Sequence, residues 1–143
     1  MLIRRRPRIL VVDDSAADVR LLREALREGE VQAEVDAAAD GAEAIGRLRS
    51  GADRPDLILL DLNLPRVSGR EVLEAVKTDP ALASIPVIVL STSASPADIA
   101  HCYAQHANAY LVKPLYLDEF GELVRALDLF WLRLAHLPDR SLV

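Results

Sequence analysis

Residues 9–15 read Ile-Leu-Val-Val-Asp-Asp-Ser, and this stretch decides the fold. The first four residues are apolar, three of them are β-branched, and none alternates with a polar residue. This pattern is typical of a strand that is buried on both faces of a parallel sheet. Ser15 is suited to cap a helix, in which apolar residues recur at intervals of three and four until Gly29. The stretch therefore predicts a strand followed directly by a helix.

The same succession of short apolar runs and amphipathic segments continues along the chain. We predict strands at 9–12, 31–37, 57–60, 86–90 and 109–112. Helical spacing predicts further helices at 42–48, 69–76 and 97–103, and a last one from 117 to 137. Five strand–helix units indicate an α/β fold, a doubly wound (βα)5 five-stranded parallel sheet with helices on both faces. We expect one domain over 1–143, with its core at about 8–137 and a short C-terminal tail.

The composition narrows the class of protein. The net charge of −5 argues against a dedicated nucleic-acid binder, so we expect no DNA partner. No apolar run approaches the roughly 20 residues that a membrane helix needs. The single cysteine, Cys102, cannot form an internal disulfide, which favours a cytoplasmic location. The arginines at positions 4, 5, 6 and 8 are expected to be a solvated segment before the first strand.

Polar residues stand where four of the predicted strands end. In open α/β sheets, ligands bind outside the carboxyl ends of the strands. The residues at these ends are Asp13 and Asp14, Asp61, Ser91 and Thr92, and Lys113. Each alone is an ordinary turn or cap residue. Independent turns, however, have no reason to gather matched charges on one edge of a sheet, so we predict a functional site there.

Three neighbouring carboxylates imply a cation. Two unit charges about 5 Å apart repel by about 3 kcal/mol at an effective dielectric constant near 20. Oxygen ligands without Cys or His favour Mg²⁺ over zinc. In phosphoryl-transfer sites Mg²⁺ bridges protein carboxylates and phosphate oxygens, and a carboxylate can itself become an aspartyl phosphate. The residues thus predict Mg²⁺-dependent phosphoryl transfer.

Four motifs in order resemble the flavodoxin-like receiver domains of bacterial two-component systems. They are I-L-V-V-D-D-S, L-I-L-L-D-L-N-L-P with Gly69 four residues on, V-I-V-L-S-T, and L-V-K-P. The resemblance covers the chain from about Arg8 to the last helix. It implies a response regulator in which Asp61 accepts a phosphoryl group from a histidine kinase. It also implies that Asp13, Asp14 and Asp61, with the backbone carbonyl of Asn63, hold Mg²⁺.

The resemblance gives roles to residues of the last two strands. Lys113 would pair with the phosphoryl group, and the Ser91 hydroxyl would bond one of its oxygens. Tyr110 would be the aromatic switch that moves inward as Ser91 follows the phosphate. The Lys113–Pro114 bond would be cis. Ser91 stands where most receivers have Thr, and Thr92 stands where a smaller residue is usual, so access to the phosphoryl group would be narrower.

Three further stretches are similar to the single-domain regulators that partner bacterial phytochromes. These are N-L-P-R-V-S-G-R-E-V-L, H-A-N-A-Y-L-V-K-P and a final F-W-L. The similarity implies a bacteriophytochrome as the histidine kinase partner. It also implies pairing of two copies through the fifth helix.

The last helix independently predicts a contact with another molecule. Leu129, Phe130, Trp131 and Leu132 are consecutive, and at 100° per residue they surround an α-helix. The sheet can cover only one side, so either Phe130 or Trp131 should face outward. We expect a homodimer interface there, with the alternatives that all four residues belong to the core or that a different partner covers them.

Three other classes of function are less well supported. A haloacid-dehalogenase-like phosphatase needs Asp-x-Asp and a cap domain, whereas Asn63 occupies the second position here. A receiver-like scaffold that works without phosphorylation would typically lack an acidic residue or the lysine, and this chain has all of them. A nucleotide-binding enzyme is disfavoured because no G-x-G-x-x-G or P-loop is present. We therefore expect a phospho-acceptor that catalyses only its own phosphorylation and dephosphorylation.

Overall fold

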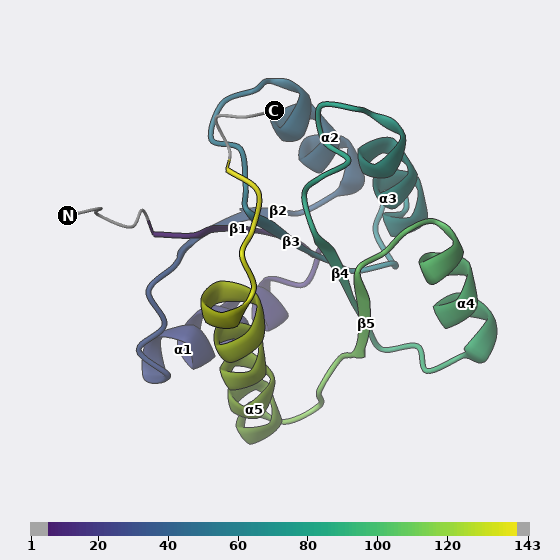
Figure 1. Cartoon of the computed structure of the whole chain (residues 1–143). Helices are drawn as coiled ribbons and strands as arrows, with labels where there is room; N and C mark the ends of the chain where they lie inside the picture. The colour runs from purple at the N-terminus through teal and green to yellow at the C-terminus, as the bar shows by residue number, and fades with distance from the viewer. Residues whose placement is uncertain (1–5, 140–143) are drawn as a thin grey trace.

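The structure is a computed structural model that describes residues 6–139, and these residues surround one parallel sheet (Figure 1). The strand order is β2-β1-β3-β4-β5. The strands are β1 (Arg8–Val12), β2 (Glu34–Ala38), β3 (Leu57–Leu60), β4 (Val87–Ser91) and β5 (Ala109–Val112). The helices are α1 (Ala16–Glu28), α2 (Gly41–Arg49), α3 (Gly69–Thr78), α4 (Pro96–Ala104) and α5 (Leu117–Leu127), followed by the π-helix η1 (Asp128–Leu134). The predicted five-stranded doubly wound fold is confirmed.

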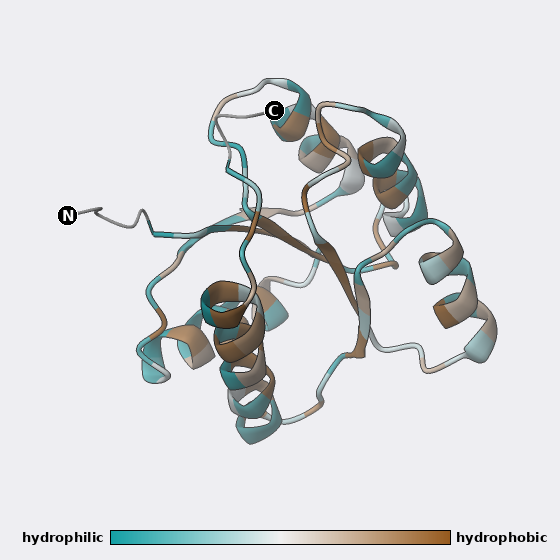
Figure 2. Ribbon diagram, in the orientation of Figure 1, coloured by the Kyte–Doolittle hydropathy of each residue, from teal (hydrophilic) through white to brown (hydrophobic). Residues whose placement is uncertain are grey.

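Helices cover both faces of the sheet. On one face α1 and α5 lie side by side, and on the other lie α2, α3 and α4 (Figure 1). The central strand β3 is fully buried: Leu57 and Leu59 pack toward α1 and α5, while Ile58 and Leu60 pack toward α2 and α3. The inner strands are accordingly apolar along their length in Figure 2. Burial on both faces is the reason that the sequence of these strands shows no alternation.

Local contacts explain where two of the helices begin. The Ser15 hydroxyl accepts a hydrogen bond from the Asp18 amide at 3.2 Å, so Ser15 caps α1 as predicted. Helix α3 begins at Gly69, where a Cβ atom would lie 2.2 Å from the Asp61 carbonyl oxygen. Only glycine permits this approach. Helix α3 therefore starts directly against the end of β3.

The second strand begins later than predicted. The Val31 amide donates to the Leu26 carbonyl at 3.0 Å, so this residue still closes the end of α1. The strand starts at Glu34, which is in register with Arg8 of β1. It lies at an edge of the sheet and is only partly buried. Its weaker apolar pattern reflects that position.

The last helix is shorter than predicted and changes type. The α-helix ends at Leu127, and η1 continues to Leu134 rather than to residue 137. The Ala135 amide donates to the Phe130 carbonyl at 2.7 Å, which is the i→i+5 bond of a π-helix. Ala135 then adopts an extended conformation, so the helix cannot continue. Residues 140–143 of the predicted tail lie outside the described residues.

The N-terminal arginines are only partly as expected. Arg4 and Arg5 lie outside the described residues, and Arg6 is exposed. Arg8 is different, because its guanidinium is half-buried among carboxylates. It contacts Glu34, Asp36 and Asp53 at 3.1, 3.7 and 3.6 Å. Arg8 therefore joins the starts of β1 and β2 instead of being solvated. Across the described chain, no helix combines the length and apolar character needed to cross a membrane.

Candidate functional site

Three carboxylates meet at the carboxyl edge of the sheet. Asp13 follows β1 and Asp61 follows β3, and the Asp61 amide donates to the Val12 carbonyl at 2.9 Å. One carboxylate oxygen from each of Asp13, Asp14 and Asp61 lies within 4.8 Å of the others. Asp13 and Asp61 are buried, whereas Asp14 is exposed. An all-oxygen set that is open to water on one side fits Mg²⁺, which usually keeps several of its water ligands.

Lys113 provides a positive charge beside these acids. Its buried Nζ lies 2.7 Å from an Asp13 carboxylate oxygen, 2.7 Å from one of Asp18 and 3.2 Å from one of Asp61. Burial lowers the pKa of Lys113, but hydrogen bonds to Asp13 and Asp18 and the charges of Asp13 and Asp61 outweigh burial. The pKa therefore lies well above its ordinary value. The ammonium is charged at any physiological pH.

At Asp13, burial outweighs the favourable contacts of the carboxylate. Burial raises the pKa of the Asp13 carboxyl, and the charge of Asp61 acts in the same direction. The hydrogen bonds from Lys113 and from the Ser15 amide, the latter at 2.8 Å, lower that pKa but do not cancel the effect of burial. A charged Asp13 is thus held in the fold at some cost in free energy. A bound cation would offset this cost.

Asp18 is a member of the site that the sequence did not indicate. It lies in the first turn of α1, three residues after the Ser15 cap. An acid at this position is a common helix-start residue, because it favours the positive end of the helix dipole. The available signal was that this helix starts at the carboxyl edge of the sheet, where an acid in the first turn can face the site.

Ser91 and Tyr110 are connected through Ser93. The Ser91 side chain is fully buried at the end of β4, and its hydroxyl accepts from the Ser93 amide at 3.1 Å. The Tyr110 hydroxyl donates to the Ser93 carbonyl at 2.7 Å, and the ring packs partly against the core beneath α2, α3 and α4. Thr92, in contrast, is exposed. The two predicted switch residues therefore contact the same loop residue.

Two other predictions at this edge have different outcomes. The amide of the exposed Asn63 donates to the Asp61 carboxylate at 3.2 Å, so Asn63 lies beside the cluster, and its carbonyl as a metal ligand stays a prediction. The cis Lys113–Pro114 bond is wrong for this structure, because every peptide bond among residues 6–139 is trans. The trans form is the one that X–Pro bonds favour by about 0.5–1 kcal/mol.

Phe130 and Trp131 lie beside a groove of about 740 Å³ between β5 and the last helix. We call it the α5 groove; its lining includes Leu111, Val112, Pro114, Leu115, Leu123, Ala126, Leu127, Phe130 and Trp131. The Phe130 side chain is 54% exposed, whereas Trp131 packs partly against the core formed with α1. Their rings meet edge to face, with centroids 5.2 Å apart. Phe130 is therefore the outward aromatic residue of the pair.

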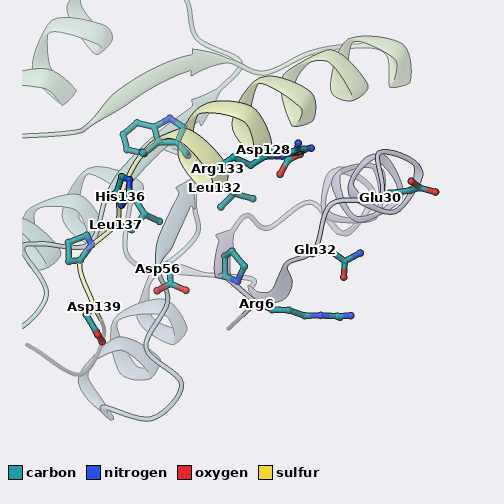
Figure 3. A pocket seen from close by; sticks show the side chains of 14 residues that line it. Arg6, Glu30, Gln32, Asp56, Asp128, Leu132, Arg133, His136, Leu137 and Asp139 are labelled. Carbon is teal, nitrogen blue, oxygen red and sulfur yellow. Dashed lines mark hydrogen bonds and ion pairs between the residues drawn. The ribbon is translucent and has the colours of Figure 1, made fainter. Parts of the chain in front are cut away.

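A second hollow, of about 690 Å³, lies at the amino ends of the strands, on the side of the sheet away from the three carboxylates (Figure 3). Residues that precede strands line it, including Arg6, Gln32 and Asp56, together with Arg133 and His136 of the C-terminal segment. None of the predicted phosphorylation or metal residues contributes to it. The C-terminal segment thus extends past the amino ends of the strands, away from Asp61.

Comparisons with known proteins agree with this geometry. Residues 9–125 match the model of the response regulator receiver domain. The response regulator Rcp1 of Synechocystis sp. is 42% identical over 135 residues, covering 91% of this chain and 92% of Rcp1.

Solved structures give the same result. The phosphorylated cyanobacterial phytochrome response regulator RcpA superposes with a TM-score of 0.89 at 46% identity, covering 94% of this chain and all of RcpA. The Mn²⁺-bound form of Rcp1 superposes with a TM-score of 0.86 at 40% identity, covering 93% of this chain and 99% of that one. The chain belongs to the family of response regulator receiver domains.

Proposed function

We propose that this response regulator accepts a phosphoryl group on Asp61 from a histidine kinase in a Mg²⁺-dependent reaction. The observation that carries the proposal is the placement of the buried Asp61 carboxylate, 3.2 Å from the Lys113 ammonium and within 4.8 Å of two further carboxylates. A buried carboxylate with a purely structural role would need only one ion-pair partner. A carboxylate that accepts a phosphoryl group needs a metal site beside it and a cationic side chain that can pair with the phosphoryl oxygens.

The reaction follows from these positions. An Asp61 oxygen forms a bond to phosphorus while the phosphorus–nitrogen bond to the kinase histidine breaks, and the imidazole leaves with the electron pair. Lys113 pairs with a phosphoryl oxygen, and the Ser91 hydroxyl donates to another. Mg²⁺ held by Asp13, Asp14 and Asp61, with the Asn63 carbonyl, would neutralise the carboxylates and the phosphoryl oxygens. The only reactions catalysed would be phosphorylation and dephosphorylation of the protein itself.

The test of this function is labelling of the purified protein. With acetyl phosphate and Mg²⁺, intact-mass measurement should show one added phosphoryl group. Asp61→Asn should abolish it, and excess EDTA should prevent it in the wild type. Asp53→Asn removes an exposed carboxylate far from the site and should leave labelling unchanged. Undiminished labelling of Asp61→Asn would disprove the assignment, and an unchanged rate in EDTA would disprove the metal requirement.

We further infer that the kinase is a bacteriophytochrome. Rcp1 and RcpA support this, because RcpA is described as a phytochrome response regulator and both align over nearly the whole of their own length. A phosphorylated bacteriophytochrome kinase should transfer its label to this chain within seconds to minutes, and a chemotaxis-type kinase should transfer it much more slowly. Equal rates would leave the general function intact and overturn this partner.

The output of the protein is proposed to be a changed protein-interaction surface rather than DNA contact. The net charge of −5 and the α5 groove support this output, and a homodimer through the last helix is the partner that we propose for the groove. The single cysteine, Cys102, is a buried free thiol, which suits a reducing cytoplasm.

A further inference from the structure

Asp18 differs from the other carboxylates that contact Lys113. A lysine ammonium has three N–H donors, and three carboxylates surround this one, at 2.7 Å for Asp13, 2.7 Å for Asp18 and 3.2 Å for Asp61. Under the proposed function, Asp13 would also bind the metal and Asp61 would become phosphorylated. Two of the three partners of Lys113 therefore change their bonding during the reaction, and only Asp18 does not.

We propose that Asp18 is the positioning residue for Lys113, holding the ammonium toward the phosphoryl site while Asp13 and Asp61 are engaged elsewhere. The inference rests on the proposed function. Asp18 does not touch the reacting atoms, so its effect would be carried through Lys113. Asp18 would hold one of the three N–H donors of Lys113 in place. The N–H donor that contacts Asp61 before phosphorylation would then be free to bond a phosphoryl oxygen.

The local structure makes Asp18 suited to this role. Its amide is bound by the Ser15 hydroxyl at 3.2 Å, and the Ser15 amide donates to Asp13 at 2.8 Å. Ser15 therefore connects the first turn of α1, through the Asp18 amide, to Asp13 of the site. The Asp18 side chain is about one-third exposed (32%), and the Lys113 side chain is almost fully buried (6%). A group fixed on a helix start holds its partner more accurately than a group on a loop.

Removing the Asp18 carboxylate has two effects on the phosphorylation rate, and they act in opposite directions: the site loses a negative charge, and Lys113 loses the group that positions it. The site holds four carboxylates and one ammonium, so the loss of one negative charge should favour the approach of an anionic phosphodonor and of Mg²⁺. Loss of position should slow phosphoryl transfer, since a misplacement of about 1 Å can cost about 100-fold in rate. If a variant without the Asp18 carboxylate is phosphorylated more slowly than the wild type, the cause is therefore the misplacement of Lys113 and not the change in charge.

The experiment measures the phosphorylation rate with acetyl phosphate at saturating Mg²⁺, together with the Mg²⁺ affinity and unfolding. Asp18→Ala and the nearly isosteric Asp18→Asn should each phosphorylate at least about tenfold more slowly, while the Mg²⁺ dissociation constant changes by less than about threefold. Asp18→Glu should recover part of the rate. In metal-free protein, the ¹⁵N signal of the Lys113 ammonium should be sharp in the wild type and broadened by exchange in Asp18→Asn.

A matched control separates this role from helix capping. Glu43 lies at the same position of α2, three residues after its cap Asp40, and Glu43→Gln should phosphorylate at the wild-type rate. Wild-type rates in Asp18→Asn and Asp18→Ala, or an equal decrease in Glu43→Gln, would overturn the positioning role. A loss of Mg²⁺ affinity as large as the loss in rate would also overturn it, because Asp18 would then act on the metal. If Asp61→Asn were still labelled, the proposed function itself would have failed.

Discussion

The Tyr110 hydroxyl donates a 2.7 Å hydrogen bond to the carbonyl of Ser93, a residue whose own amide is bound by the buried Ser91 hydroxyl. The Ser93 hydroxyl also donates to Asp98 of α4 at 2.6 Å, and Asp98 pairs with Arg70 of α3. A movement of Ser91 toward a phosphoryl oxygen would therefore reach Tyr110 and α4 through a single loop residue.

Removing the Tyr110 hydroxyl should loosen this loop without blocking the chemistry. Tyr110→Phe should lose about 0.5–1.5 kcal/mol of unfolding free energy, the usual worth of one hydrogen bond. It should keep labelling by acetyl phosphate, and amide hydrogen exchange should become faster at residues 93–95. Tyr116→Phe, which changes an exposed tyrosine outside this network, is the control. Unchanged exchange in Tyr110→Phe would show that the hydrogen bond does not hold the loop.

The raised pKa of Asp13 leads to a prediction about stability and pH. Because the folded-state pKa exceeds the unfolded value of about 3.9, Asp13 favours folding below that pH, and this contribution is lost as the pH rises through the folded-state pKa. At pH 7 the charged Asp13 should destabilise the metal-free protein. Asp13→Asn should therefore be more stable than the wild type in EDTA, by urea denaturation, and this advantage should disappear below about pH 4.

Metal should reverse that comparison. Mg²⁺ should raise the urea midpoint of the wild type, because a ligand that binds only the folded state stabilises it, and should do little for Asp13→Asn. Asp14→Asn, with its exposed side chain, should change metal-free stability less. If Asp13→Asn were less stable than the wild type in EDTA at pH 7, the contact with Lys113 would outweigh the burial of Asp13.

Lys113→Ala should separate the response to phosphorylation from metal binding. The ammonium can meet phosphoryl oxygens but adds nothing to the affinity for a cation. Mg²⁺ binding, measured by calorimetry, should therefore be retained or tighter, while the phosphorylation-dependent change in hydrogen exchange at residues 91–95 should be lost. Metal-free stability should fall by about 3–5 kcal/mol, because two buried carboxylates lose their cation. A variant that loses Mg²⁺ binding and keeps the phosphorylation-dependent change would contradict this role.

The sequence predicts those parts of the site that depend on strand ends. Asp13 and Asp61 follow directly after unbroken apolar runs, so their place at the carboxyl edge follows from the parallel sheet alone. Asp18 could not be found in this way, because an acid in the first turn of a helix has the same sequence pattern whether it contacts solvent or Lys113. Which residues touch across the site depends on how α1 is rotated, and sequence spacing does not determine that rotation.

The last helix shows the same limit. Four consecutive apolar residues predict that some of them face outward, and Leu129 and Phe130 are indeed exposed while Trp131 and Leu132 pack on the core. The sequence could not say which, because the answer depends on the change from α-helix to π-helix after Leu127. That change depends on a backbone hydrogen bond, which every residue type except proline can donate.

The exposure of Phe130 makes a specific test of the proposed homodimer possible. Phe130 is 54% exposed and lines the α5 groove. A twofold pair would place this groove of one copy against the same groove of the other. Phe130→Ala should remain folded by circular dichroism and should weaken the dimer by about 2 kcal/mol, or about thirtyfold, in analytical ultracentrifugation. Trp131→Ala should mainly reduce stability, because Trp131 packs on the core.

Leu129 provides the matched control for this interface. It is 56% exposed and lies next to Phe130 on the same helix, but it does not line the groove. If the dimer uses the α5 groove, Leu129→Ala should sediment like the wild type while Phe130→Ala becomes monomeric. If both variants dissociate equally, the interface is a general apolar face of η1 rather than the groove. A wild-type protein that sediments as a monomer at high micromolar concentration, with and without phosphorylation, would rule out the dimer and leave Phe130 to contact another protein.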